Sequence, residues 1–82
     1  MDWNFKNNMD YIFDLFRKTA RVISSCENMT QLEGAYNYVA NVEKYLTHFE
    51  RTERQEQFCE KQMAEFRKML KVKNRAFNEF VD

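Results

Sequence analysis

The fold of this chain depends on residues 50–57, which read ERTERQEQ and contain no apolar side chain. Before this stretch, apolar residues recur mostly at gaps of three and four: Leu32, Ala35, Val39, Val42, Leu46 and Phe49. After it, a second such series follows: Cys59, Met63, Phe66, Leu70, Phe77 and Phe80. Because an α-helix turns 100° per residue, each series forms one apolar stripe that must be buried. The polar stretch therefore separates two amphipathic helices or interrupts one long helix.

Two chain paths fit the polar stretch. Continuing the first of these stripes through it would place Glu53 in the core, and Thr52 with Gln55 forms a pair typical of a helix start. We therefore predict a turn near residues 50–52. The alternative is one helix over residues 29–80, roughly 75 Å long at about 1.5 Å per residue, which would need a dimer to cover its stripe.

The beginning of the chain carries a third stripe, formed by Phe5, Met9, Ile12, Phe16 and Ile23, with Phe13 and Ala20 alongside. It stops at residues 24–28, where turn-favouring residues cluster. We predict helices over residues 5–24, 29–49 and 53–80 in a single domain, residues 1–82. Because short connections make neighbouring helices antiparallel, the expected fold is all-α, an antiparallel three-helix bundle with a long third helix.

The start of the second helix has two candidate caps. Asn28 with Gln31 and Thr30 with Glu33 each place a side-chain oxygen where it can accept from an unpaired backbone N–H group. Gly34 follows within the first turns, where glycine costs about 1 kcal/mol relative to alanine. We interpret Gly34 as allowing a close contact between helices.

The composition describes a small, neutral protein. Its 82 residues, 44% of them hydrophobic, allow one core with roughly 3–5 kcal/mol of net stability, which a second copy could increase. The alternative of self-association therefore stays open. Thirteen basic and thirteen acidic residues cancel, so bulk charge draws the chain to neither nucleic acid nor membrane.

The expected location is the reducing cytoplasm. No apolar run is long enough to span a bilayer, and Asp2 and Asp10 exclude a signal peptide at the start. Cys26 and Cys59 are too few for a disulfide framework.

The residues that usually carry catalysis are absent or scattered. His48 is the only histidine, and the two cysteines are expected at opposite ends of the bundle as small apolar fillers. Glutamates between residues 50 and 60 alternate with arginine and lysine, as on a solvated helix face. We therefore predict no catalytic, cofactor-binding or metal site, and no enzymatic activity.

The distribution of charge carries more information than its sum. The third helix has a basic group without acids, Arg67, Lys68, Lys71, Lys73 and Arg75. The first helix has Arg17, Lys18 and Arg21 near its end. If these helices are parallel, both groups meet at one end, opposite Asp10 and the glutamates near residue 53. Such cations complement helix macrodipoles, bind an acidic protein or, as a third interpretation, bind phosphates.

Two tyrosines lie beside the stripe of the second helix. Tyr38 and Tyr45 are seven residues apart with Asn41 between them, and Trp3 and Phe5 precede or open the first helix. Large amphipathic aromatic residues favour interfaces, but the same positions also seal the edge of a core. Both interpretations of the tyrosines stay open.

One segment resembles a known group of proteins. It consists of residues 23–28, ISSCEN, together with Gln31, Leu32, Ala35, Asn37 and Tyr38. A helix end, a small polar turn and a second helix with leucine and alanine on its buried face are similar to those in small early and accessory proteins of T-even-type phages. The resemblance covers about fifteen positions of structural type. It implies a stoichiometric binder that redirects or blocks a host or phage protein, and it assigns no functional residue.

Together these features predict a non-enzymatic protein-binding module, a phage-type accessory protein or inhibitor whose partner has an acidic surface. The predicted partner-binding residues are Arg17, Arg21, Lys68, Lys71 and Arg75, with Tyr38 and Tyr45 as aromatic anchors. One alternative is a nucleic-acid-binding protein that uses the same cations. Another is a structural homo-oligomer in which the third helix pairs with itself.

Overall fold

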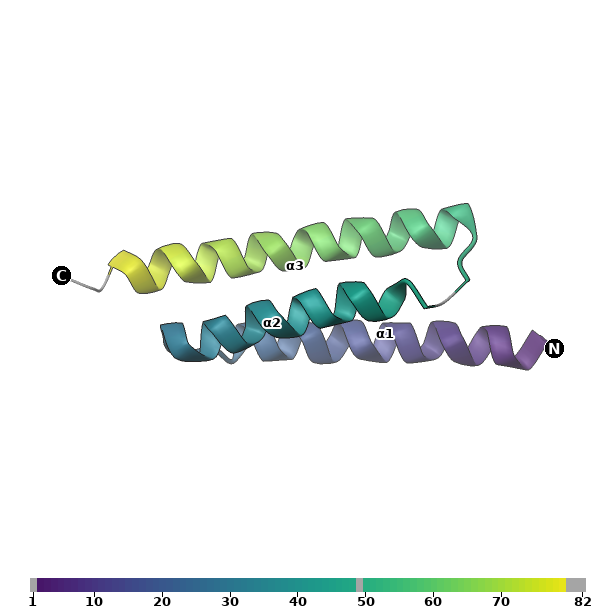
Figure 1. Ribbon diagram of the computed structural model, residues 1–82, viewed down its shortest axis with the longest axis horizontal. Coiled ribbons are helices and arrows are strands. Elements are labelled where there is room, and N and C mark those ends of the chain that lie inside the picture. The colour runs from purple at the N-terminus through teal and green to yellow at the C-terminus, as the bar shows by residue number, and fades with distance from the viewer. Residues whose placement is uncertain (1, 49, 80–82) are drawn as a thin grey trace.

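The computed structural model describes the backbone of residues 2–48 and 50–79 and the side chains of residues 10–48 and 50–79. Within these residues the chain forms three α-helices and no β-strand: α1 (Asp2–Ser24), α2 (Met29–Leu46) and α3 (Glu53–Glu79). In Figure 1, α2 runs back along α1, and α3 then follows the direction of α1. The predicted all-α fold with three helices is confirmed. The alternative of one helix over residues 29–80 is wrong, because residues 47–48 and 50–52 are not helical.

The helix bounds differ from the predicted ones at two ends. Helix α1 already begins at Asp2, and α2 ends at Leu46 rather than at residue 49. At the end of α2, the Thr47 hydroxyl donates to the Lys44 carbonyl, and the Arg51 guanidinium donates to the Leu46 carbonyl. These polar groups satisfy the last carbonyls of α2, so the helix stops before the polar stretch. Phe49 and Phe80 lie outside the described residues.

The buried residues of the three stripes form one core between the helices. Its apolar members are Ile12, Phe16, Ile23, Cys26, Leu32, Ala35, Val39, Val42, Leu46, Cys59, Met63, Phe66 and Leu70. Phe77 is half-buried against this core. The side chains of Trp3, Phe5 and Met9 lie outside the described part of the chain.

Thr19 is a core residue that the apolar pattern alone omitted. It is fully buried and occupies the gap in the α1 stripe between Phe16 and Ile23. Its hydroxyl donates to the Leu15 carbonyl, with an O···O distance of 2.7 Å. A hydroxyl that bonds four residues back along its own helix can be buried without losing a hydrogen bond, so this polar residue fits an apolar stripe.

Both inter-helix turns end at a side-chain cap. Asn28 begins α2: its Oδ1 accepts from the Gln31 N–H at 2.9 Å, while Gln31 Oε1 accepts from the Glu27 N–H at 2.8 Å. Of the two predicted caps, the structure therefore uses Asn28. At the start of α3, Thr52 and Gln55 each accept from the other's backbone N–H, at 3.2 and 2.9 Å. This is a capping box, as the sequence predicted.

The interpretation of Gly34 as a close-contact residue is wrong. Gly34 is exposed, its φ is not positive, and an added Cβ would meet no atom within 4 Å. Neither helix packing nor backbone conformation therefore requires glycine at this position.

Polar contacts tie α3 to both other helices. Lys73 Nζ donates to the carbonyls of Ser24 and Cys26, at 3.0 and 2.9 Å, where α1 ends. On the other side of α3, Arg67 pairs with Glu43 of α2. The bundle is elongated, 56 × 18 × 16 Å, and the C-terminal end of α3 extends past the turn between α1 and α2 (Figure 1).

Candidate functional site

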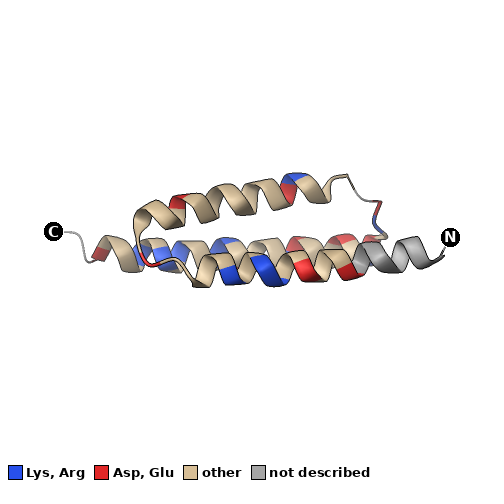
Figure 2. Ribbon diagram, turned by 90° about the horizontal axis from the view of Figure 1, so that it is seen from below, with Lys and Arg blue, Asp and Glu red and all other residues tan. Residues whose placement is uncertain are grey.

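Charge is unevenly distributed along the bundle. Figure 2 shows the lysines and arginines of α1 and α3 gathered toward the C-terminal end of the bundle, and most acidic residues of these helices toward the opposite end. The neutral molecule is therefore dipolar along its long axis. Such a charge separation orients a protein as it approaches a charged surface.

Three cations of the basic half have partners within the bundle. Lys18 Nζ lies 3.3 Å from the Asp14 carboxylate, one turn away on α1, and Arg67 pairs with Glu43. Lys73 donates to the carbonyl of Ser24, the last residue of α1, and to that of Cys26 in the turn that follows, so it complements the negative end of that helix. The macrodipole interpretation of the basic residues therefore applies to Lys73.

The other five cations are the predicted partner-binding ones. Each is exposed, and none forms an ion pair with a side chain that the structure describes: Arg17, Arg21, Lys68, Lys71 and Arg75. We call these five residues the basic surface. Arg17 and Arg21 are one turn apart on α1, and the other three follow each other at gaps of three and four on α3. Two rigid helices, rather than a loop, therefore present them.

A shallow, mostly apolar groove of about 370 Å³ lies beside the basic surface, where α1 ends against α3. Ile23 forms part of its wall, and Met69, Val72 and the stem of Lys68 contribute from α3. Val72 is 63% exposed, the largest value among the exposed large hydrophobic residues of the described chain. An apolar side chain of a partner could be buried here beside a positive charge.

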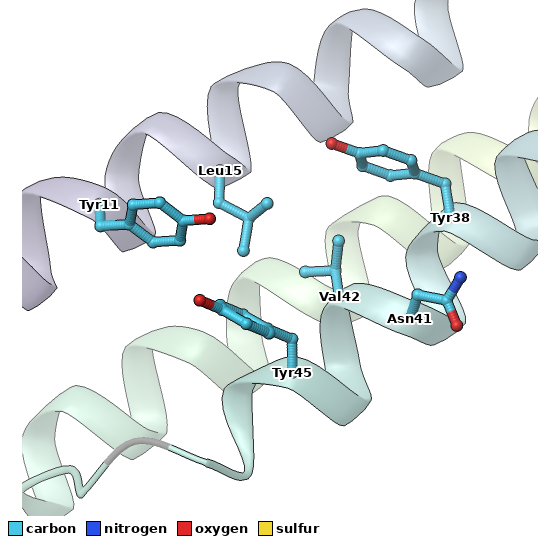
Figure 3. A pocket seen from close by; sticks show the side chains of 6 residues that line it. All are labelled: Tyr11, Leu15, Tyr38, Asn41, Val42 and Tyr45. Atoms are coloured by element: carbon cyan, nitrogen blue, oxygen red, sulfur yellow. The ribbon is translucent and has the colours of Figure 1, made fainter.

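Figure 3 shows a second concave region, about 260 Å³, between α1 and α2. Tyr11 and Leu15 enter it from α1, and Val42 and Tyr45 from α2. The rings of Tyr11 and Tyr45 have centroids 5.9 Å apart and are tilted by 46°, with their hydroxyls turned toward each other. A side-chain hydrogen bond to Tyr11, followed by desolvation, raises the pKa of Tyr45 above its ordinary value of 10.0.

The two predicted tyrosines belong to this second region and not to the basic surface. Tyr38 is half-buried against the core and lines the groove with Asn41, while Tyr45 is 40% exposed. Tyr38 thus seals the edge of the core, and Tyr45 presents its ring to solvent. Tyr11, which is 51% exposed, was missed by sequence reasoning. Tyr11 lies one turn before Leu15 on the same side of α1, and this spacing could have indicated its position.

A partly exposed pair of phenylalanines joins α1 to α3 at the acidic half. Phe13 and Phe58 are 43% and 40% exposed, and their rings meet edge to face with centroids 5.5 Å apart. Phe58 also contacts the buried Phe16. We attribute this pair to covering the core, because Phe58 joins the exposed ring of Phe13 to the buried one of Phe16.

Of the remaining reactive residue types, the two cysteines are part of the core, whereas the histidine is exposed. Cys26 and Cys59 are free thiols buried in the core, and burial raises the pKa of the Cys59 thiol. His48 lies against the ring of Tyr45, with centroids 6.4 Å apart. Among the described residues, no group of three or more His, Cys, Asp or Glu side chains could hold a metal ion.

No helix in the described part of the chain is long and apolar enough to cross a membrane. Comparison of the chain with protein-family models, with curated proteins and with solved structures finds no match in any of the three. Function is therefore inferred from the geometry of the basic surface and of the tyrosine-lined groove.

Proposed function

We propose that this protein is a non-enzymatic binding module that docks on an acidic surface of another protein. The observation that supports this most directly is the basic surface. Its five exposed cations on α1 and α3 have no ion pair with a described side chain, whereas three neighbouring cations have partners within the bundle. Water and salt screen exposed charges, but a cation without an ion pair still attracts an acidic partner more strongly than one whose field is partly cancelled by a neighbouring carboxylate.

The geometry of the helices adds to the electrostatic attraction. Helix positions hold the cations at fixed spacing, so little backbone entropy is lost when they meet carboxylates. The groove beside Lys68 offers apolar area next to these charges. Interfaces gain most of their affinity from such buried apolar contacts, while rim charges speed association and select the partner.

The tyrosine-lined groove is a second contact region in this proposal. Tyr45 presents a ring that a partner could cover, and Tyr38 holds the groove's shape from its half-buried position. The accessory or inhibitory role in the cytoplasm follows from the resemblance of residues 23–28 and their neighbours to phage accessory proteins. Identification of the partner tests that role.

The test is capture of the partner from extracts of the source cells, with the purified protein as bait and quantitative mass spectrometry as the readout. The doubly reversed variant K68E/K71E changes the basic surface. The matched control K44E/K61E makes the same change in net charge at exposed lysines outside it. We expect wild type and control to recover the same protein, and the K68E/K71E variant to recover at least about tenfold less, which corresponds to about 1.4 kcal/mol.

Circular dichroism melts of all three proteins check that each is folded. Equal recovery of the partner by the K68E/K71E variant and by wild type would remove the basic surface from the proposal. A loss with both variants would show that net charge, and not this surface, determines capture.

The same unpaired cations also favour a second candidate, binding to nucleic acid. Contacts to phosphates release counterions, so retention on a DNA or RNA column should fall steeply between about 50 and 200 mM salt. Elution of wild type at the lowest salt would reject this candidate. Retention that the K68E/K71E variant loses would support it over an acidic protein partner.

A further inference from the structure

Helix α3 carries a series of charges that is symmetric about Ala64. Glu60 and Lys68 lie four residues before and after it, and Glu53 and Arg75 lie eleven residues before and after it. All five residues are exposed. Steps of four, seven and eleven residues return to nearly the same side of an α-helix, so these residues form one stripe, which we call the symmetric stripe.

The symmetric stripe is complementary to its own reversed copy. An antiparallel α3 centred on the same alanine would place Glu53 opposite Arg75 and Glu60 opposite Lys68. Twofold symmetry would form each of these pairs twice. At the centre, Ala64 would meet Ala64 of the other copy, and its small side chain allows the two helices to approach closely. None of the four charged residues forms an ion pair with a side chain that the structure describes.

We infer that the occupant of the symmetric stripe is a second copy of this chain, with its α3 antiparallel to the first. Charge complementarity favours this occupant: only a partner with the reverse order of charges at the same spacing matches all four residues, and the chain itself is such a partner. This dimer does not require the proposed binding to an acidic protein, although the two contacts share part of one surface.

The residues beside the stripe determine on which side the second copy lies. Phe58 contacts Phe13 of α1, and Lys61 lies three residues, or about one turn, after Phe58. Lys61 therefore lies on the side of α3 that is nearer to α1. In the antiparallel pair it would approach Lys68 of the other copy, a like charge. The second copy is therefore displaced away from α1.

The opposite side of the stripe is favourable. Lys71 lies seven residues after Ala64, so it falls on the stripe itself, on its α2 side, where the neighbouring Arg67 pairs with Glu43. Glu56 lies on the same side, and reversal about Ala64 brings it close to Lys71 of the other copy. Two further ion pairs form there, so the second copy docks over the α2 side of α3.

The strength of this contact follows from its chemistry. The stripe from Glu53 to Arg75 is roughly 33 Å long at about 1.5 Å per residue, and it is polar except at its centre. Exposed ion pairs are individually weak and are screened by salt. The dimer is therefore of the transient class, populated at high protein concentration and low ionic strength.

A second copy and an acidic partner compete for part of the same surface. Both need Lys68 and Arg75, but only the second copy needs Glu53 and Glu60, and only the acidic partner uses Arg17 and Arg21. Variants can therefore separate the two proposals.

The experiment measures molar mass by sedimentation equilibrium up to about 1 mM protein, in about 20 mM and in about 500 mM salt. We expect the mass of wild type to rise from 10.1 kDa toward twice that value at low salt, and to stay near 10.1 kDa at high salt. The variants E53K/E60K and K68E/R75E should each stay monomeric, because their stripes carry mostly one sign of charge. An equimolar mixture of the two should associate, because every opposed pair is again of opposite sign.

The variant R17E/R21E is the control outside the stripe and should dimerise like wild type. Circular dichroism confirms that each variant is folded, since Glu53 also lies in the first turn of α3. A wild type that stays monomeric at low salt overturns the inference. So does association that either reversed variant retains on its own, or a mixture of the two variants that stays monomeric.

Discussion

At the scale of single residues, the polarity and size of a side chain do not always predict whether it is buried or exposed. Thr19 is polar and buried, because its hydroxyl bonds the Leu15 carbonyl within α1. Gly34 is small and yet contacts nothing where a Cβ would be. A hydrogen bond within α1 explains why the polar Thr19 is buried. Gly34 faces open solvent, so its small size serves no packing contact.

Replacement of Gly34 by alanine should stabilise the protein. The position is helical, exposed and open, so alanine lowers the backbone entropy of the unfolded chain without a clash. We expect G34A to raise the free energy of unfolding by about 1 kcal/mol, and Tm by about 4–8 °C. The reverse change at an exposed alanine of the same helix, A40G, should lower stability by about the same amount. A destabilised G34A variant in urea denaturation would show a contact that the structure lacks.

At the scale of elements, the ends of the helices depend on side chains that satisfy backbone groups. The chain has no proline and one glycine, so polar caps terminate its helices. Asn28 and Thr52 both accept from the third residue of the helix that follows, and a glutamine reaches back in each case. The polar stretch at residues 50–57 therefore contains a helix start and not only solvated charges.

The competing caps of α2 can be separated by substitution. N28A removes the acceptor for the Gln31 N–H and should cost about 1 kcal/mol of stability. T30A changes an exposed helical residue that makes no cap, and it should stay within about 0.5 kcal/mol of wild type. Chemical denaturation of both variants gives the comparison. A larger loss for T30A than for N28A would mean that α2 starts at Thr30 in solution.

At the scale of the whole molecule, α3 connects the parts. It packs on both other helices, and its Lys73 donates to the carbonyls of Ser24 at the end of α1 and of Cys26 in the turn that follows. The same helix carries three of the five residues of the basic surface, and the symmetric stripe. Lys73 therefore contributes to stability, whereas its neighbours Lys68 and Lys71 belong to the proposed binding surface.

The different roles of these lysines can be measured as stability. K73M keeps the apolar stem but removes the two hydrogen bonds to Ser24 and Cys26, and we expect a loss of roughly 1–2 kcal/mol. K71M removes the same charge from an exposed position without such bonds, and it should change stability by less than about 0.5 kcal/mol. Thermal and urea unfolding of both variants test this. Equal losses of stability in K73M and K71M would indicate a general effect of charge on α3 rather than the hydrogen bonds of Lys73 at the end of α1.

The sequence by itself determined the number and the faces of the helices, because helical periodicity and capping are local properties. The three apolar stripes contain nearly every buried residue of the described chain, and the Thr52–Gln55 cap marks the start of α3. The same local reasoning placed the basic residues late in the first helix and along the second half of the third. It could not state which cations of the basic half would find a partner.

Only the tertiary structure decided that question. Lys73 reaches the end of α1 across 47 and 49 residues of sequence, and Arg67 reaches Glu43 across 24. It also separated Tyr45 from the basic surface and paired it with Tyr11. These contacts depend on how the helices are rotated and shifted against one another, and a periodic pattern within one helix does not specify the rotation or shift of its neighbour.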